Sequence, residues 1–185
     1  MGTKAQTQAQ AVLAFWFEEL APAQWFEKGP ALDRTIAERF GELHARALAC
    51  ECFEFRETVE GRLAEIIVLD QFSRNIHRDT PAAFAADPLA LGLAQEAVRL
   101  GADQALSPER RAFLCMPYMH SESARIHEQA ERLFDQPGLS RNLEFERRHR
   151  AIIERFGRYP HRNAILGRAS SDEERRFLET PGSSF

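Results

Sequence analysis

Residues 145–163, FERRHRAIIERFGRYPHRN, decide the fold of this chain because they contain the end of a long helix and the turn after it. Four apolar residues recur at the spacing of one helix face: Phe145, Ile152, Ile153 and Phe156. Gly157 supplies a C-cap, since glycine readily adopts the left-handed conformation at which helices commonly end. Pro160 then fixes a turn rich in hydrogen-bonding side chains. The stretch predicts a helix from Ser140 to Phe156 followed by a polar turn.

His149 lies on the apolar face of this predicted helix, where the pattern would place another hydrophobic residue. One interpretation is a core histidine that is hydrogen-bonded to a backbone carbonyl. The other is an imidazole that faces an internal pocket, with a pKa open to adjustment. The sequence leaves both open.

The remainder of the chain has the same helical periodicity and no convincing alternating strand. Start and stop signals include Pro22, Pro88, Gly101, Ser107-Pro108 and the capping box that begins at Ser171. Further helices are expected over residues 31–49, through 63–70, and over 121–134. We therefore predict an all-α fold of about eight helices. They are expected to form antiparallel pairs in one domain over residues 1–185.

Composition limits the classes of function. The net charge of −4 argues against a general nucleic-acid binder, which needs excess cations to neutralise phosphates. The chain contains no apolar run of transmembrane length and no signal-peptide pattern, so no membrane association is expected. The three cysteines form no disulfide framework. A soluble cytoplasmic protein is the default expectation.

A second polar stretch, residues 69–78, has the sequence LDQFSRNIHR. Asp70 continues the apolar face formed by Leu63, Ile66 and Ile67, so its carboxylate should point inward. A buried carboxylate needs a cation or several N–H donors, and Arg74 lies one helical turn away. This pair is either a structural ion pair or part of a functional site.

The third polar stretch is Met116-Pro117-Tyr118-Met119-His120-Ser121-Glu122. Pro117 is expected to interrupt its helix, so that His120 and Glu122 appear at the mouth of the next one. The simpler interpretation is a turn between helices, in which Ser121 caps and Glu122 interacts with the helix dipole.

No known catalytic or metal motif is present. The chain lacks a glycine-rich phosphate loop, a His-Glu-x-x-His pair and a Gly-x-Ser-x-Gly elbow. Cys50-x-Cys52 has no matching second pair, so zinc is not expected. We expect neither a metal nor a cofactor.

Several of these segments resemble one known family along nearly the whole chain. They are Val12 to Phe17, Trp25-Phe26, Leu69 to Asn75, Met119 to Glu122, Arg147 to Arg168, and the end at Pro181 to Phe185. The chain resembles the bacterial domain-of-unknown-function family nine-two-four. That resemblance implies a tetratricopeptide-like all-helical fold and implies no catalytic residues. Ser73 departs from the family, which usually has proline there, and is expected to loosen a turn slightly.

The leading functional hypothesis is one internal site for a small anionic metabolite, with enzymatic action left undecided. Asp70, His120, His149 and His161 are the candidates for proton transfer. The candidates for ligand binding are Arg74, Asn75, Glu122, Arg158, Arg162 and Asn163.

Two alternatives remain. The chain could be a tetratricopeptide-like interaction module that binds a peptide or partner protein through a patch containing Trp16, Trp25 and Phe26. The polar residues could instead be purely structural. The sequence gives no oligomeric state.

Overall fold

The computed structural model describes residues 3–184, and its regular structure is helical throughout that range. The α-helices are α1 Lys4–Ala14, α2 Pro30–Leu48, α3 Val59–Ile67, α4 Ser73–Ile76, α5 Asp87–Arg99, α6 Pro108–Met119, α7 Ala124–Phe134, α8 Ser140–Phe156 and α9 Asp172–Leu178. Short 3-10 turns occupy Pro22–Trp25, Phe53–Glu57, Pro81–Phe84, Ala102–Ala105 and Pro160–Arg162. The prediction of an all-α fold is confirmed.

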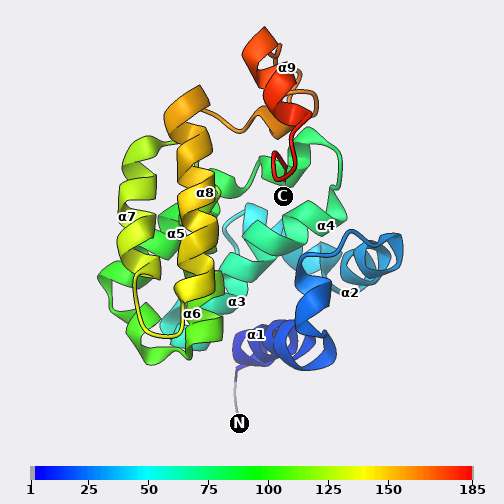
Figure 1. Ribbon diagram of the computed structural model, residues 1–185. Coiled ribbons are helices and arrows are strands. Elements are labelled where there is room, and N and C mark those ends of the chain that lie inside the picture. The colour runs from blue at the N-terminus through cyan, green and yellow to red at the C-terminus, as the bar shows by residue number, and fades with distance from the viewer. Residues whose placement is uncertain (1–2, 185) are drawn as a thin grey trace.

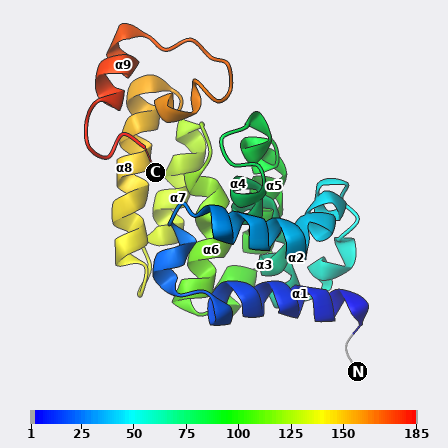
Figure 2. The ribbon, with the colours of Figure 1, turned by 90° about the vertical axis from the view of Figure 1, so that its right-hand side faces the viewer.

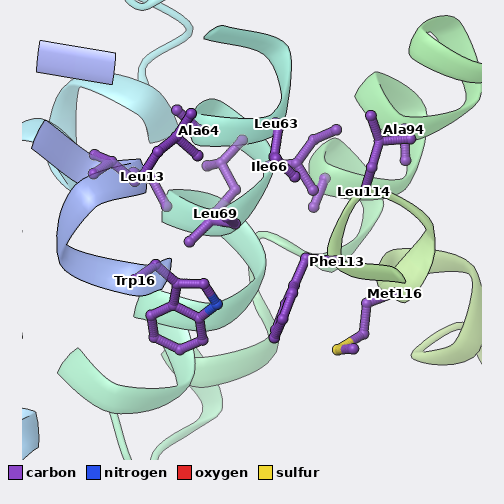
Figure 3. Packing of buried hydrophobic residues seen from close by; sticks show 14 of the residues in the cluster. Leu13, Trp16, Leu63, Ala64, Ile66, Leu69, Ala94, Phe113, Leu114 and Met116 are labelled. Carbon is purple, nitrogen blue, oxygen red and sulfur yellow. The ribbon is translucent and has the colours of Figure 1, made fainter. Parts of the chain in front are cut away.

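Helix α3 runs through the centre of the molecule, where it contacts α1, α5 and α6 (Figure 1). Its burial follows from its composition, since Leu63, Ala64, Ile66 and Ile67 are all completely inaccessible to solvent. Figure 3 shows Leu63, Ile66 and Leu69 between Leu13 and Trp16 on one side and Phe113 and Leu114 on the other. The core is therefore built around the helix that leads directly into Asp70.

Helices α6, α7 and α8 pack side by side at one end of the fold, as both ribbon views show (Figures 1 and 2). Neighbours in sequence are thus neighbours in space, which is compatible with a tetratricopeptide-like arrangement. Gly157 ends α8 with φ +69°, as its sequence position predicts. Within residues 3–184, no helix is both long and apolar enough to cross a membrane.

Two helices contain a widened π-helical turn that sequence periodicity did not indicate. One covers Phe15–Glu19 at the end of α1, and the other covers Val68–Phe72 between α3 and α4. Every residue of the second turn is buried. Such turns are frequently found at functional sites, because the extra residue changes the direction of the side chains around it.

Three local predictions were wrong. Pro117 does not interrupt α6 but lies inside its last turn, and the helix continues to Met119. The cap position of α7 is Ser123 rather than Ser121. Phe145 is 41% exposed and does not belong to the core, so the buried face of α8 is narrower than the periodicity indicated.

Ser73 does not lie in a loosened turn, because the backbone remains helical from Val68 through Ile76. Its buried hydroxyl donates to the Leu69 carbonyl at 2.5 Å and is 2.8 Å from Nε2 of His44. Burial lowers the pKa of His44 to about 4, so its neutral ring can donate from Nε2 to Ser73. Ser73 therefore connects α4 to α2.

The aromatic residues predicted as a possible interaction patch, Trp16, Trp25 and Phe26, do not lie together on the surface. Trp16 is completely buried and packs edge-on against Phe72 and Phe113. Trp25 is half-buried and donates from Nε1 to the Trp16 carbonyl at 2.7 Å. Phe26 is 68% exposed. The two tryptophans are therefore core and supporting residues, and they do not form an open docking surface.

Two glycines provide a matched test of the packing around α3. A Cβ on Gly61 would lie 2.0 Å from the Phe55 carbonyl oxygen, whereas a Cβ on Gly41 in α2 would meet nothing within 4 Å. Gly61→Ala should lower the free energy of unfolding by about 1–3 kcal/mol because backbone must move. Gly41→Ala should raise it by about 0.5–1 kcal/mol through helix propensity. Urea unfolding of both variants measures the difference, and equal effects would contradict the tight approach at Gly61.

Candidate functional site

The polar turn after α8 is fixed to the corner between α6 and α7. The Tyr159 hydroxyl donates to the Met119 carbonyl at 2.6 Å, and its backbone N–H donates to Oε1 of Glu122 at 2.8 Å. Arg168 binds both carboxylate oxygens of Glu122, at 2.6 and 2.9 Å. The turn therefore carries Arg162 to a defined position against the middle of the fold.

Asp70 is the most deeply buried acid of the site, with 1% of its side chain exposed. Its Oδ1 lies 2.7 Å from Nδ1 of His120 and 3.3 Å from the Arg74 guanidinium. Gln71 donates to Oδ2 at 2.6 Å. Burial opposes ionisation, but His120 and Arg74 outweigh it and keep the pKa of Asp70 below its ordinary value. Asp70 is therefore an ionised carboxylate inside the protein.

His120 ends α6, and its ring orientation is set by Asp70. Burial is the main cause that lowers the pKa of His120, and the Asp70 charge opposes it. A neutral ring next to an ionised carboxylate carries its proton on Nδ1, which leaves the Nε2 lone pair as the basic atom. This is the arrangement of a histidine prepared to accept a proton.

Asp87, the first residue of α5, connects two arginines. Its carboxylate receives a bidentate pair from Arg74 at 2.9 and 3.1 Å. Nη1 of Arg162 approaches it at a longer 3.3 Å. Asp87 is thus paired mainly with Arg74, and its carboxylate neutralises the charge of Arg162 only in part.

Arg162 is 6% exposed, and its guanidinium carbon lies 4.6 Å from the ring centroids of both Phe84 and Tyr159. The Arg162 cation therefore makes cation–π contacts with two aromatic rings. Nε is buried without a hydrogen-bond partner among the described residues. Burial and the neighbouring Arg74 lower the pKa of Arg162 from its usual value. Arg162 is therefore a buried guanidinium whose hydrogen-bonding capacity is not fully used by the described residues.

A cavity of about 420 Å³ opens next to these groups. Its polar wall consists of Asp87, His120, Ser121, Glu122 and Arg162. Its apolar wall consists of Pro81, Phe84, Ala85, Pro88, Leu91, Pro117 and Leu166. The volume lies in the range of small-molecule pockets, about 300–1,000 Å³, and such pockets combine apolar walls with a few convergent polar groups.

The structure brings together five of the residues predicted for the site: Asp70, Arg74, His120, Glu122 and Arg162. His149 and His161 lie behind them, with ring centroids 5.8 and 5.6 Å from that of Tyr159. Burial lowers the pKa of His149 to about 3 and that of His161 to about 4. Nδ1 of His149 is 2.8 Å from the Phe145 carbonyl oxygen, as expected for a core histidine that is hydrogen-bonded to the backbone. Neither histidine lines the cavity.

Three other predicted residues make contacts elsewhere. Asn75 donates to Asp33 at 2.9 Å, and Arg158 binds Glu174 at 2.7 and 2.9 Å. Asn163 donates to Ser170 at 3.0 Å and accepts from Arg168. Asn75 thus joins α4 to α2, and Arg158 joins the turn after α8 to α9. Their side chains are absent from the cavity wall.

Sequence reasoning missed Asp87, Phe84 and a second buried pair, His127 and Glu146. Nδ1 of His127 is 2.7 Å from Glu146 Oε1, both side chains are completely buried, and burial raises the pKa of Glu146. Nε2 of His127 donates to the Ser121 carbonyl at 2.8 Å. Glu146 directly follows the apolar Phe145. A buried helix face drawn through Glu146 in place of Phe145 would have predicted the burial of its side chain. Asp87 was not singled out, because Pro88 after it indicates only the start of a helix.

No group of three or more His, Cys, Asp or Glu side chains within residues 3–184 is arranged to hold a metal ion. Arg162 can hold an anion, and His120 can accept or return a proton beside it.

The Asp70 network predicts a specific dependence of stability on pH. Because the folded-state pKa of Asp70 lies below its unfolded value of about 3.9, its carboxylate stabilises the protein above that pH, and this contribution is lost as the pH falls through the folded-state pKa. Asp70→Asn should lower the free energy of unfolding by about 3 kcal/mol at neutral pH. Its unfolding free energy should also fall less steeply than that of the wild type below pH ~4.

Glu144→Gln is the control, since Glu144 is 65% exposed in a surface ion pair with Arg148. Denaturant unfolding at stepped pH measures all three proteins. Parallel curves for the wild type and Asp70→Asn would contradict an ionised, buried Asp70.

The comparisons with known proteins agree with the fold and name no activity. No curated protein is similar enough to this chain to count as a relative. A solved structure, of the protein of unknown function ATU0120 from Agrobacterium tumefaciens, is 40% identical with a TM-score of 0.90. The match covers 95% of this chain and 99% of that one. The model of the family described as "Bacterial protein of unknown function (DUF924)" matches residues 12–182, and the chain belongs to that family.

Proposed function

We propose that this protein binds a small anionic metabolite in the cavity next to α5, with Arg162 as the main contact to the anion. The observation that carries the proposal is the state of Arg162. Arg162 lines the 420 Å³ cavity, contacts the rings of Phe84 and Tyr159, and has one long contact to Asp87. Its buried Nε has no hydrogen-bond partner among the described residues. Buried polar groups are normally satisfied, so an exception at a cavity indicates a missing partner.

The other arginines of the site support this assignment by contrast. Arg74 makes a bidentate pair with Asp87, and Arg168 makes one with Glu122. A purely structural cluster would be expected to satisfy its third guanidinium in the same way. Arg162 instead keeps donors available, which favours a ligand over a structural role.

His120 gives the site a group for proton transfer. Asp70 orients the ring, and Asp87, Arg74 and Arg162 surround it with charge. Any reaction at this site would therefore use His120 as the base and Asp70 to position it. His149 and His161 support Tyr159 and the turn from behind.

Arg162 can be tested with a thermal-shift panel of phosphorylated and carboxylated metabolites. A ligand at 100 times its Kd should stabilise the protein by about 2.7 kcal/mol, which is a Tm increase of roughly 5–10 °C for a chain of this size. Arg162→Gln and Arg162→Lys should both lose this stabilisation, since neither keeps the planar fork. Arg148→Gln, at an exposed ion pair, should keep it.

Circular dichroism shows whether each variant is folded. Equal ligand stabilisation of the wild type and a folded Arg162 variant would overturn the assignment of Arg162, and the absence of any stabilising anion would overturn the proposed function.

Ligand affinity should also depend on pH through His120. Its pKa is lowered in the free protein, and a bound anion in the same cavity would raise it again, so binding takes up a proton. Affinity should therefore increase as the pH falls through the raised pKa of His120 in the complex, and His120→Gln should remove most of this dependence. Calorimetry in buffers of different ionisation enthalpy measures the proton directly. Unchanged proton uptake in the variant would show that another group is responsible.

A further inference from the structure

We infer that the anion bound here is the monocarboxylate of a largely apolar molecule, with its carboxylate on Arg162 and its hydrocarbon part against Phe84, Leu91 and Leu166. This inference rests on the proposed function and narrows it from anions in general to one chemical class. Three features of the site carry it: the charge balance of the cluster around the cavity, the contacts of Arg162 and the composition of the apolar wall.

The charged groups around the cavity balance one another, and protonation of His120 can offset one further negative charge. Three acids, Asp70, Asp87 and Glu122, face three arginines, Arg74, Arg162 and Arg168, so the cluster is neutral when His120 is neutral. A carboxylate adds one negative charge, which protonation of His120 would offset. A phosphate monoester carries about −1.5 to −2 at neutral pH. Next to Asp87 and Glu122, its second charge would have no counterpart.

The geometry of Arg162 favours a planar anion. The guanidinium carbon lies 4.6 Å from the ring centroids of both Phe84 and Tyr159, so aromatic contacts occupy part of its surface and leave its N–H donors for a ligand. Parallel N–H donors along one edge match the two oxygens of a carboxylate in a bidentate pair. Nε of Arg162, which has no hydrogen-bond partner among residues 3–184, is one of these edge donors.

The rest of the wall is unsuited to a polar metabolite. Beyond the polar end, the cavity is bounded by prolines and by apolar side chains, among them Leu91 from α5 and Leu166 after the turn. A sugar or a second carboxylate placed there would lose its hydrogen bonds to water without replacement. A hydrocarbon chain or ring would bury apolar surface at that position and gain affinity.

Two homologous series test this inference on the intact wild-type protein. The first is the n-alkanoates from butanoate to octanoate, and the second is the alkyl phosphates of equal chain length, each titrated by calorimetry. We expect alkanoate affinity to rise about three- to fourfold per methylene, the value for full burial of a CH2 group, until the cavity is full. Each alkyl phosphate should bind at least tenfold more weakly than the alkanoate of equal length.

Variants locate the binding. Leu91→Asn should make alkanoate affinity depend less on chain length, and Arg162→Lys should lower the affinity for every alkanoate. Phe26→Ser is the control, because Phe26 is an exposed aromatic outside the cavity wall, and it should change neither. If Phe26→Ser removes the binding instead, the alkanoates occupy the surface and the inference is overturned.

The outcomes separate the two proposals. A flat alkanoate series, or tighter binding of the phosphates that still depends on Arg162, would overturn the apolar monocarboxylate and leave the anion site in place. No binding in either series, together with no shift from the metabolite panel, would overturn both. The wild-type series decides between these outcomes even if a variant fails to fold.

Discussion

The arrangement of the site depends on one buried carboxylate. Asp70 lies where the central helix α3 leads through a π-helical turn into α4, and it holds His120 at the end of α6. An ionised acid at this depth is stable only with partners at short distance, so it fixes the relative positions of the elements that carry them. Arg74 extends the constraint to Asp87 on α5. The interaction that neutralises Asp70 thus also shapes one side of the cavity.

Arg162 differs from the other arginines of the cluster because the carboxylate nearest to it, that of Asp87, is already paired with Arg74. Arg74 uses both oxygens of Asp87, so Arg162 has a single long contact there. Two aromatic rings supply the remaining stabilisation of the cation. These ring contacts stabilise the guanidinium without using its N–H donors. The proposed role of Arg162 in ligand binding depends on those donors.

Much of this fold could be predicted from the sequence, because helical spacing and caps such as Gly157 are local signals. The inward direction of Asp70 could also be predicted, since it follows from the same spacing. The π-helical turn could not, because its extra residue per turn leaves the composition unchanged. The role of Asp87 was equally hidden. Its partners lie 13 and 75 residues away, and only the tertiary fold brings them together.

A crystal structure of the protein grown with hexanoate would show directly whether Arg162 binds an anion from outside the protein. We expect density for a planar carboxylate at the N–H donors of Arg162, with the hydrocarbon chain lying toward Leu91 and the Arg74–Asp87 pair unchanged. An empty cavity, with Arg162 turned to form a bidentate pair with Asp87 or Glu122, would show instead that the cluster is structural.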